Sequence, residues 1–126
     1  MINFGYKDGV VYSIANKNVA SISRSETGVY TIYFTKPIWV KTHGYGDNRY
    51  IDIFAIGNAA EDFTYGFTNT LQMNPNWLRQ YVDGRLTESG NYALVNYVVI
   101  YCINNNTDEL KDPRSAQCFI YATETD

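Results

Sequence analysis

Apolar and polar residues alternate along most of this chain, and the clearest example is the stretch GVYTIYFTKPIWV, residues 28–40. In an extended chain, Tyr30, Ile32 and Phe34 share one face, and we predict that this face fills a core. The opposite face consists of Val29, Thr31 and Tyr33. Because that second face has a tyrosine of its own, we expect it to be covered by a second sheet, by a partner chain such as another subunit, or by a ligand.

Other segments alternate in the same way between turn residues. Strands are predicted in INFGYK, VVYSIA, NVASISR, YIDIFAIG, DFTYGFT, NYALVNYVVIYCIN and AQCFIYATE. Asp8-Gly9 is a strong hairpin signal, and Lys36-Pro37 predicts the end of a strand or a sheet edge. Only NPNWLRQYVDGRL has the spacing of a short helical turn. The pattern predicts an all-β chain, an antiparallel β-sandwich or jelly roll with at most one helical turn, as a single domain over residues 1–126.

The amino-acid composition indicates that this β-rich fold also has a contact surface. The 126 residues are 45% hydrophobic and 18% charged, which is typical of folded globular chains. Aromatic residues make up 16%, and 12 of them are tyrosines. Tyrosine favours strands and surfaces that are partly apolar and partly wet.

Charge and hydropathy exclude several classes of partner. The net charge is −3 and the basic residues form no cluster, so nucleic acid is not an expected partner. No apolar run approaches the ~20 residues of a membrane-spanning helix, and the start MINFGYKDG does not have the pattern of a secretory signal. We expect a protein that is not embedded in a membrane.

The two cysteines leave two alternatives open. If the two last strands form a hairpin centred on Leu110, Cys102 and Cys118 lie opposite each other and a disulfide is possible. The favoured interpretation is two buried thiols. With one histidine and no C-x-x-C or H-x-x-x-H spacing, no metal site and no cofactor is predicted.

Catalytic constellations are poorly represented, and we expect no enzyme. His43 lies beside Gly44 in a polar loop, and no serine has the context of a nucleophile elbow. The remaining hypothesis is a small glycan-active hydrolase that pairs Asp52 with Glu61 or Asp62. The favoured interpretation is that Asp52 faces solvent and that the other two are turn residues.

Binding is better supported, because two loops combine aromatic rings with charged and amide groups. Such mixtures bind sugars and protein receptors, and rigid β-scaffolds commonly present them on loops. The loops are WVKTHGYGDNRY and NPNWLRQYVDGR. The predicted ligand-binding residues are Trp39, His43, Tyr45, Asp47, Arg49, Trp77, Arg79 and Tyr81.

The stretch VASISRSETGVYTIYFTKPI resembles a pattern near the C-termini of bacteriophage tail-fibre and tailspike proteins. The matching residues are Val19, Ile22, Arg24, Gly28, Tyr30, Ile32, Phe34 and Pro37, with NYVVIYCIN and CFIYATE as the late strands. The resemblance covers the two ends of the chain and leaves out roughly residues 42–90. It implies a jelly roll of the C1q and tumour-necrosis-factor type that forms homotrimers at fibre tips.

The same resemblance implies a function and a location. Such a domain would bind a bacterial surface glycan or an outer-membrane protein, at the tail tip of a virion assembled in the host cytoplasm. A C-terminal trimerisation and folding module that touches no receptor is the alternative from another class.

Overall fold

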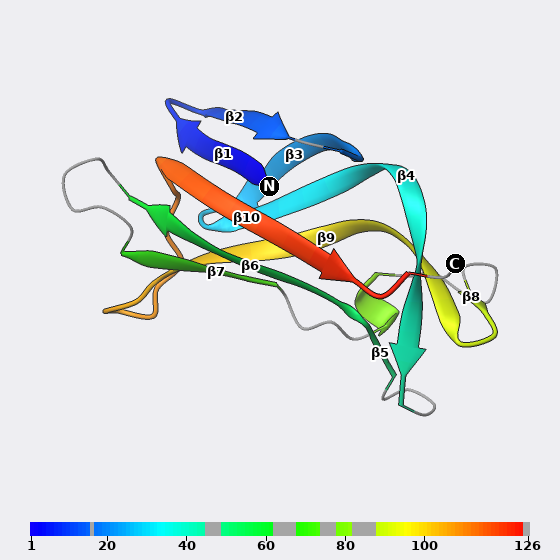
Figure 1. Ribbon diagram of the computed structural model, residues 1–126. Coiled ribbons are helices and arrows are strands. Elements are labelled where there is room, and N and C mark those ends of the chain that lie inside the picture. Colours follow the sequence, from blue (N-terminus) through cyan, green and yellow to red (C-terminus); the bar gives the residue numbers. More distant parts are fainter. Residues whose placement is uncertain (16, 45–48, 62–67, 74–77, 82–87, 125–126) are drawn as a thin grey trace.

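The computed structural model describes residues 1–15, 17–44, 49–61, 68–73, 78–81 and 88–124, and it is all-β (Figure 1). The strands are β1 (Ile2–Lys7), β2 (Val10–Ala15), β3 (Val19–Glu26), β4 (Val29–His43), β5 (Tyr50–Ile51), β6 (Ile53–Ala60), β7 (Asn69–Met73), β8 (Glu88–Ser89), β9 (Tyr92–Asn104) and β10 (Ser115–Ala122). A single 3₁₀ turn, η2, spans Leu78–Gln80. It confirms the helical turn predicted in this region, and the predicted strand DFTYGFT lies largely outside the described residues.

All pairings are antiparallel, and the strands form one curled sheet in the order β2-β1-β10-β6-β7-β9-β4-β3. Strands β5 and β8 extend it by pairing with β4 and β9. The two edge strands, β2 and β3, contact each other, so the sheet is nearly closed. This barrel-like arrangement confirms the predicted all-β class.

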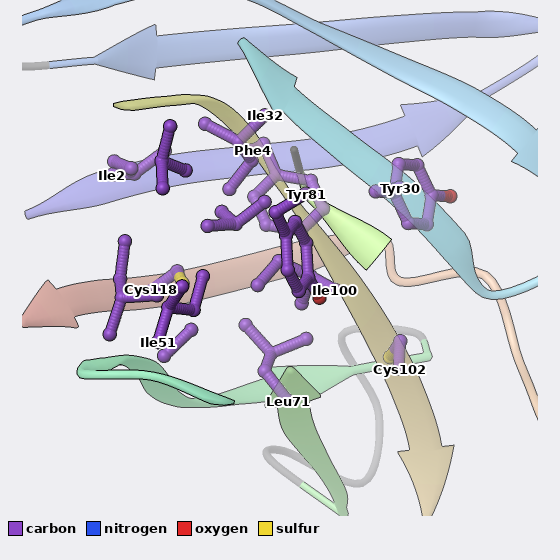
Figure 2. Close-up of a cluster of buried hydrophobic side chains, with 14 of the residues drawn as sticks. Ile2, Phe4, Tyr30, Ile32, Ile51, Leu71, Tyr81, Ile100, Cys102 and Cys118 are labelled. Carbon is purple, nitrogen blue, oxygen red and sulfur yellow. The ribbon is translucent and has the colours of Figure 1, made fainter. Parts of the chain in front are cut away.

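The core lies between the two halves of this curled sheet (Figure 2). Phe4 of β1 contacts Tyr30 of β4 across the interior, with ring centroids 5.1 Å apart. Tyr30 and Ile32 are fully buried and Phe34 is partly buried, as alternation predicts. Of the opposite face, Val29 is buried, whereas Tyr33 is exposed, with its ring centroid 6.0 Å from that of Tyr97.

The local turn signals are confirmed. Asp8 and Gly9 both have positive φ between β1 and β2, as a tight two-residue hairpin turn requires. Gly28 has a φ of 73° between β3 and β4, and a Cβ there would lie 2.8 Å from the Lys111 nitrogen. Glycine is therefore needed at position 28 for two reasons, backbone conformation and close packing.

Of the two alternatives predicted at Lys36-Pro37, the end of a strand is wrong, since β4 continues to His43. The ladder between β4 and β9 instead shifts register between Tyr33 and Ile38, and the strand bends in its middle (Figure 1). Proline is tolerated there because the interruption in the ladder does not require its missing N–H.

The hairpin predicted from β9 and β10 is also wrong. Strand β9 pairs with β7 and β4, and β10 pairs with β1 and β6. Cys102 and Cys118 therefore belong to strands that are not neighbours, and both are buried free thiols (Figure 2). The interpretation as small buried hydrophobes is confirmed.

Candidate functional site

The outer face of the second half of β4 presents Trp39, Lys41 and His43. Their neighbours Val40 and Thr42 are buried, so alternation turns these three side chains away from the core. Trp39 and His43 are partly buried and Lys41 is exposed. Over four residues of strand, the tryptophan and the histidine lie ~13 Å apart.

Strand β5 extends this face. Tyr50 is the cross-strand partner of His43, and the two rings stack with centroids 5.2 Å apart and planes 23° apart. The Nε2 atom of His43 lies 3.4 Å from Oδ2 of Asp52. We call Trp39, Lys41, His43, Tyr50 and Asp52 the β4–β5 strip. Tyr50 remains 41% exposed, so the strip offers an accessible aromatic ring beside a carboxylate.

The carboxylate of Asp52 is held in its ionised form. A hydrogen bond from Thr123 lowers its pKa most, burial opposes this effect, and the contact with His43 and the charge of Lys41 lower the pKa further. The main chain fixes its position, because Asp52 N–H donates to Lys41 C=O and Thr123 N–H donates to Asp52 C=O. An ionised, anchored carboxylate is a strong acceptor for hydroxyl groups.

The structure brings the two predicted loops together. The Leu78 N–H of η2 donates to the Arg49 C=O at 2.9 Å, just before β5 begins. Trp39, His43 and Arg49 are described and lie in or next to the strip. Tyr45, Asp47 and Trp77, and the side chain of Arg79, lie outside the described residues.

Tyr81, predicted as a ligand-binding residue, lies in the core and not on the strip. Its side chain is 2% exposed and packs against Tyr97 with ring centroids 5.7 Å apart. Burial raises its pKa, as expected for a phenol in the core. Tyr81 closes the core beneath η2.

The carboxylate pair of the hydrolase hypothesis is separated by the whole of β6. Asp52 precedes that strand and Glu61 follows it, so ~25 Å of extended chain lies between them. Glycosidase carboxylates lie about 5–10 Å apart. Glu61 instead accepts hydrogen bonds from Asn69 and Asn104 at the opposite end of the sheet. Asp62 lies outside the described residues.

Lys41 and Tyr50 of the strip, and Thr123 that anchors Asp52, are not among the predicted binding residues. Tyr50 is the last residue of the first predicted loop. Lys41 has the same alternation as Trp39 and His43, so the strand pattern itself was a sufficient signal. Thr123 comes from the other end of the chain and has no local signal. Within the described ranges, no group of three or more potential ligands could hold a metal ion.

Comparison with known proteins gave no match to a family model, a curated protein or a solved structure. None of the described residues belongs to a helix with the length and apolar character that crossing a membrane requires.

Proposed function

We propose that this chain is a recognition domain that binds a bacterial surface glycan or outer-membrane protein, as the tip of a phage tail fibre or tailspike. The β4–β5 strip is its binding surface, and its chemistry favours the glycan. The observation that carries the proposal is the exposed Tyr50 ring, stacked on His43 and next to the anchored carboxylate of Asp52.

Each element of the strip matches a feature of sugars. Aromatic faces stack on the apolar C–H faces of sugar rings. The Asp52 carboxylate accepts hydrogen bonds from sugar hydroxyls, and the Lys41 ammonium group donates hydrogen bonds to them. The second half of β4 pairs with β5 on one side and with β9 on the other. The strip is therefore held in place, and little conformational entropy is lost on binding. The ~13 Å from Trp39 to His43 favours an extended oligosaccharide over a single sugar.

The residues that resemble the phage pattern belong to the framework. Arg24, Gly28 and Tyr30 all donate hydrogen bonds to Asp112 in the loop before β10. This loop is thereby fixed to the turn between β3 and β4. The resemblance therefore supports the fold and its tail-fibre context, whereas the β4–β5 strip supports what is bound.

A homotrimer is part of the proposal, supported by exposed apolar side chains on the outer sides of β2, β10 and β6. Ile56 lies opposite Phe119, and Phe54 opposite Tyr121, on the solvent side of β6 and β10. The members, which we call the β2–β6 face, are Val10, Tyr12, Ile14, Phe54, Ile56, Phe119 and Tyr121, each 42–75% exposed. A side chain of this size presents ~200 Å² when it is fully exposed, and each of these is about half exposed. Together the seven side chains therefore present roughly 700 Å², near the ~800 Å² that one partner contributes to a stable interface.

Binding to arrays of bacterial surface polysaccharides and adsorption to whole cells test the proposal. Tyr50→Ala and Asp52→Asn should each weaken binding about tenfold or more. Tyr33→Ala, which removes an exposed tyrosine elsewhere, should leave it unchanged. If the wild type binds neither cells nor polysaccharides, the recognition function is wrong, and the trimerisation module becomes the better description.

A further inference from the structure

The wall of the curled sheet has an open groove on one side, with a volume of about 430 Å³. Strand β10 forms one bank with Phe119–Ala122, and Phe34 and Ile38 of β4 form the other. Lys17–Val19, from the turn before β3, closes one rim. The floor is apolar, since buried Ile2 and Cys118 lie there. Its volume is that of a typical ligand site.

The groove exists because β10 has no strand partner here on one side. Strand β1 pairs with β10 only as far as Ile2 opposite Cys118. The next pairing on that side is the single bridge from Val40 to Glu124. The Lys41 N–H of β4 also donates to the Thr123 C=O at 2.8 Å. Between these pairings, residues 119–122 span about 13 Å of strand with no partner strand in the described part of the chain.

The main chain of β10 directs hydrogen-bonding groups into this gap. Thr123 N–H donates to Asp52 C=O, so the odd-numbered residues of β10 bond toward β6. Alternation turns the N–H and C=O groups of Ile120 and Ala122 to the other side, into the groove. Strand edges with such groups are templates for another strand.

The opposite bank offers no comparable ladder, because Asn18 already occupies it. Thr35 N–H donates to the Asn18 C=O at 3.0 Å, and Lys36 N–H donates to Asn18 Oδ1 at 2.7 Å. The Asn18 amide donates in turn to Lys36 C=O. A guest strand therefore pairs with β10 alone and meets β4 only through apolar side chains.

We propose that this groove binds an extended peptide segment of a partner protein, which adds as a strand to β10 in line with β1. Apolar side chains on alternate residues of the peptide fill the space between Ile38 and Ile120. Main-chain hydrogen bonds to Ile120 and Ala122 supply directionality, as in other cases of strand addition. The proposal is independent of glycan binding at the β4–β5 strip.

The probe is a capped heptapeptide of alternating threonine and valine that ends in lysine, titrated by calorimetry into the wild type, Ala122→Pro and Ala122→Ser. Proline removes the Ala122 N–H, one of the two that point into the groove, and leaves the ladder to β6 intact, whereas serine keeps this N–H. We expect equal binding to the wild type and Ala122→Ser, and binding about tenfold weaker to Ala122→Pro. The same peptide with every internal amide N-methylated should not bind.

Amide hydrogen exchange on the wild type gives a test that needs no variant. At saturating peptide, exchange at Ile120 and Ala122 should slow, and exchange at the Asn105 amide, which donates to the Thr68 C=O away from the groove, should not. Unchanged exchange at both groove amides, or equal affinity of a folded Ala122→Pro variant, would overturn the proposal. Binding of dodecanoate without binding of the peptide would also overturn it and identify a lipid pocket.

Discussion

Asp112 is the residue on which the hydrogen bonds of Arg24, Gly28 and Tyr30 converge. It accepts from Arg24 Nε and Nη2, from the Gly28 N–H and from the Tyr30 hydroxyl, at 2.7–3.0 Å. Partial burial raises its pKa, but these donors outweigh that effect and hold it below the usual range. The Arg24 guanidinium also lies over the Tyr6 ring, 4.5 Å from its centroid. The Asp112 carboxylate thus joins the turn between β3 and β4, the hairpin of β1 and β2, and the loop before β10.

Asp112→Asn should destabilise the chain by about 2 kcal/mol, because the Tyr30 hydroxyl and the Gly28 N–H lose a charged acceptor. Chemical denaturation at pH 7 measures this change. Asp108→Asn is the matched control: the residue is exposed and has a φ of 57°, which asparagine tolerates, so a change within about 0.5 kcal/mol is expected. Equal effects of the two variants would contradict the role given to Asp112.

The same carboxylate predicts how stability depends on pH. Its pKa is lower in the folded chain than in the unfolded chain, where it is about 3.9. The unfolded state therefore binds more protons, and the free energy of unfolding falls as pH drops below about 4 through the folded pKa. Asp112→Asn should flatten this acid dependence in denaturation curves from pH 2 to 6. Asp52, whose pKa is also lowered, adds an acid dependence of its own that the variant retains.

The two thiols should be unreactive in the folded chain. Burial raises the pKa of Cys102 to about 11 and that of Cys118 to about 12, so the reactive thiolate is scarce at pH 8. Titration with a thiol-specific disulfide reagent should detect neither cysteine in the native protein and both in 6 M guanidinium. A native disulfide would leave no reactive thiol after denaturation, and that result would contradict the strand order.

At the scale of strands, Gly57 sets how closely β6 and β10 approach. A Cβ at this position would overlap with the Gln117 carbonyl of β10 and touch Leu71 of β7. Gly57→Ala should therefore force these strands apart and cost about 2–3 kcal/mol in urea unfolding. Asn58→Ala, one residue along the strand and facing solvent, should change stability by less than about 0.5 kcal/mol. A neutral Gly57→Ala would mean that the two strands are spaced more widely.

The strands and short turns were predictable because their signals are local. Asp8-Gly9 and Gly28 specify conformations that few other residues adopt, and alternation identified the buried face of Tyr30 and Ile32. Strand order is not local, and this is why the hairpin of β9 and β10 was wrongly predicted. Strand β9 lies between β7 and β4, and its loop to β10 is held by Asp112, which interacts with residues more than eighty positions away.

The same distinction applies to the candidate site. Trp39 and His43 were identified from the composition of one loop, and Lys41 follows from their spacing. The anchoring of Asp52 by Thr123, and the burial of Tyr81, depend on contacts between distant segments. Composition around position 81 favours a binding loop and a core contact equally, so only packing distinguishes the two.

At the scale of the whole molecule, the β2–β6 face should determine the oligomeric state. We expect light scattering to give a mass near three times 14.4 kDa at all concentrations tested. Replacing Ile56 and Phe119 by lysine places charges opposite each other in the middle of this face and should yield a monomer. Tyr33→Lys, on the face first expected to contact other subunits, should remain trimeric.

The monomeric double variant also separates recognition from assembly, because the β4–β5 strip and the β2–β6 face share no residue. If recognition resides in each strip, the monomer should still bind the polysaccharide, with the loss confined to the avidity that three linked sites provide, on the order of 10²-fold. Loss of all binding would place the site between subunits. A wild-type monomer would contradict the trimer and leave the strip as the binding surface of a single chain.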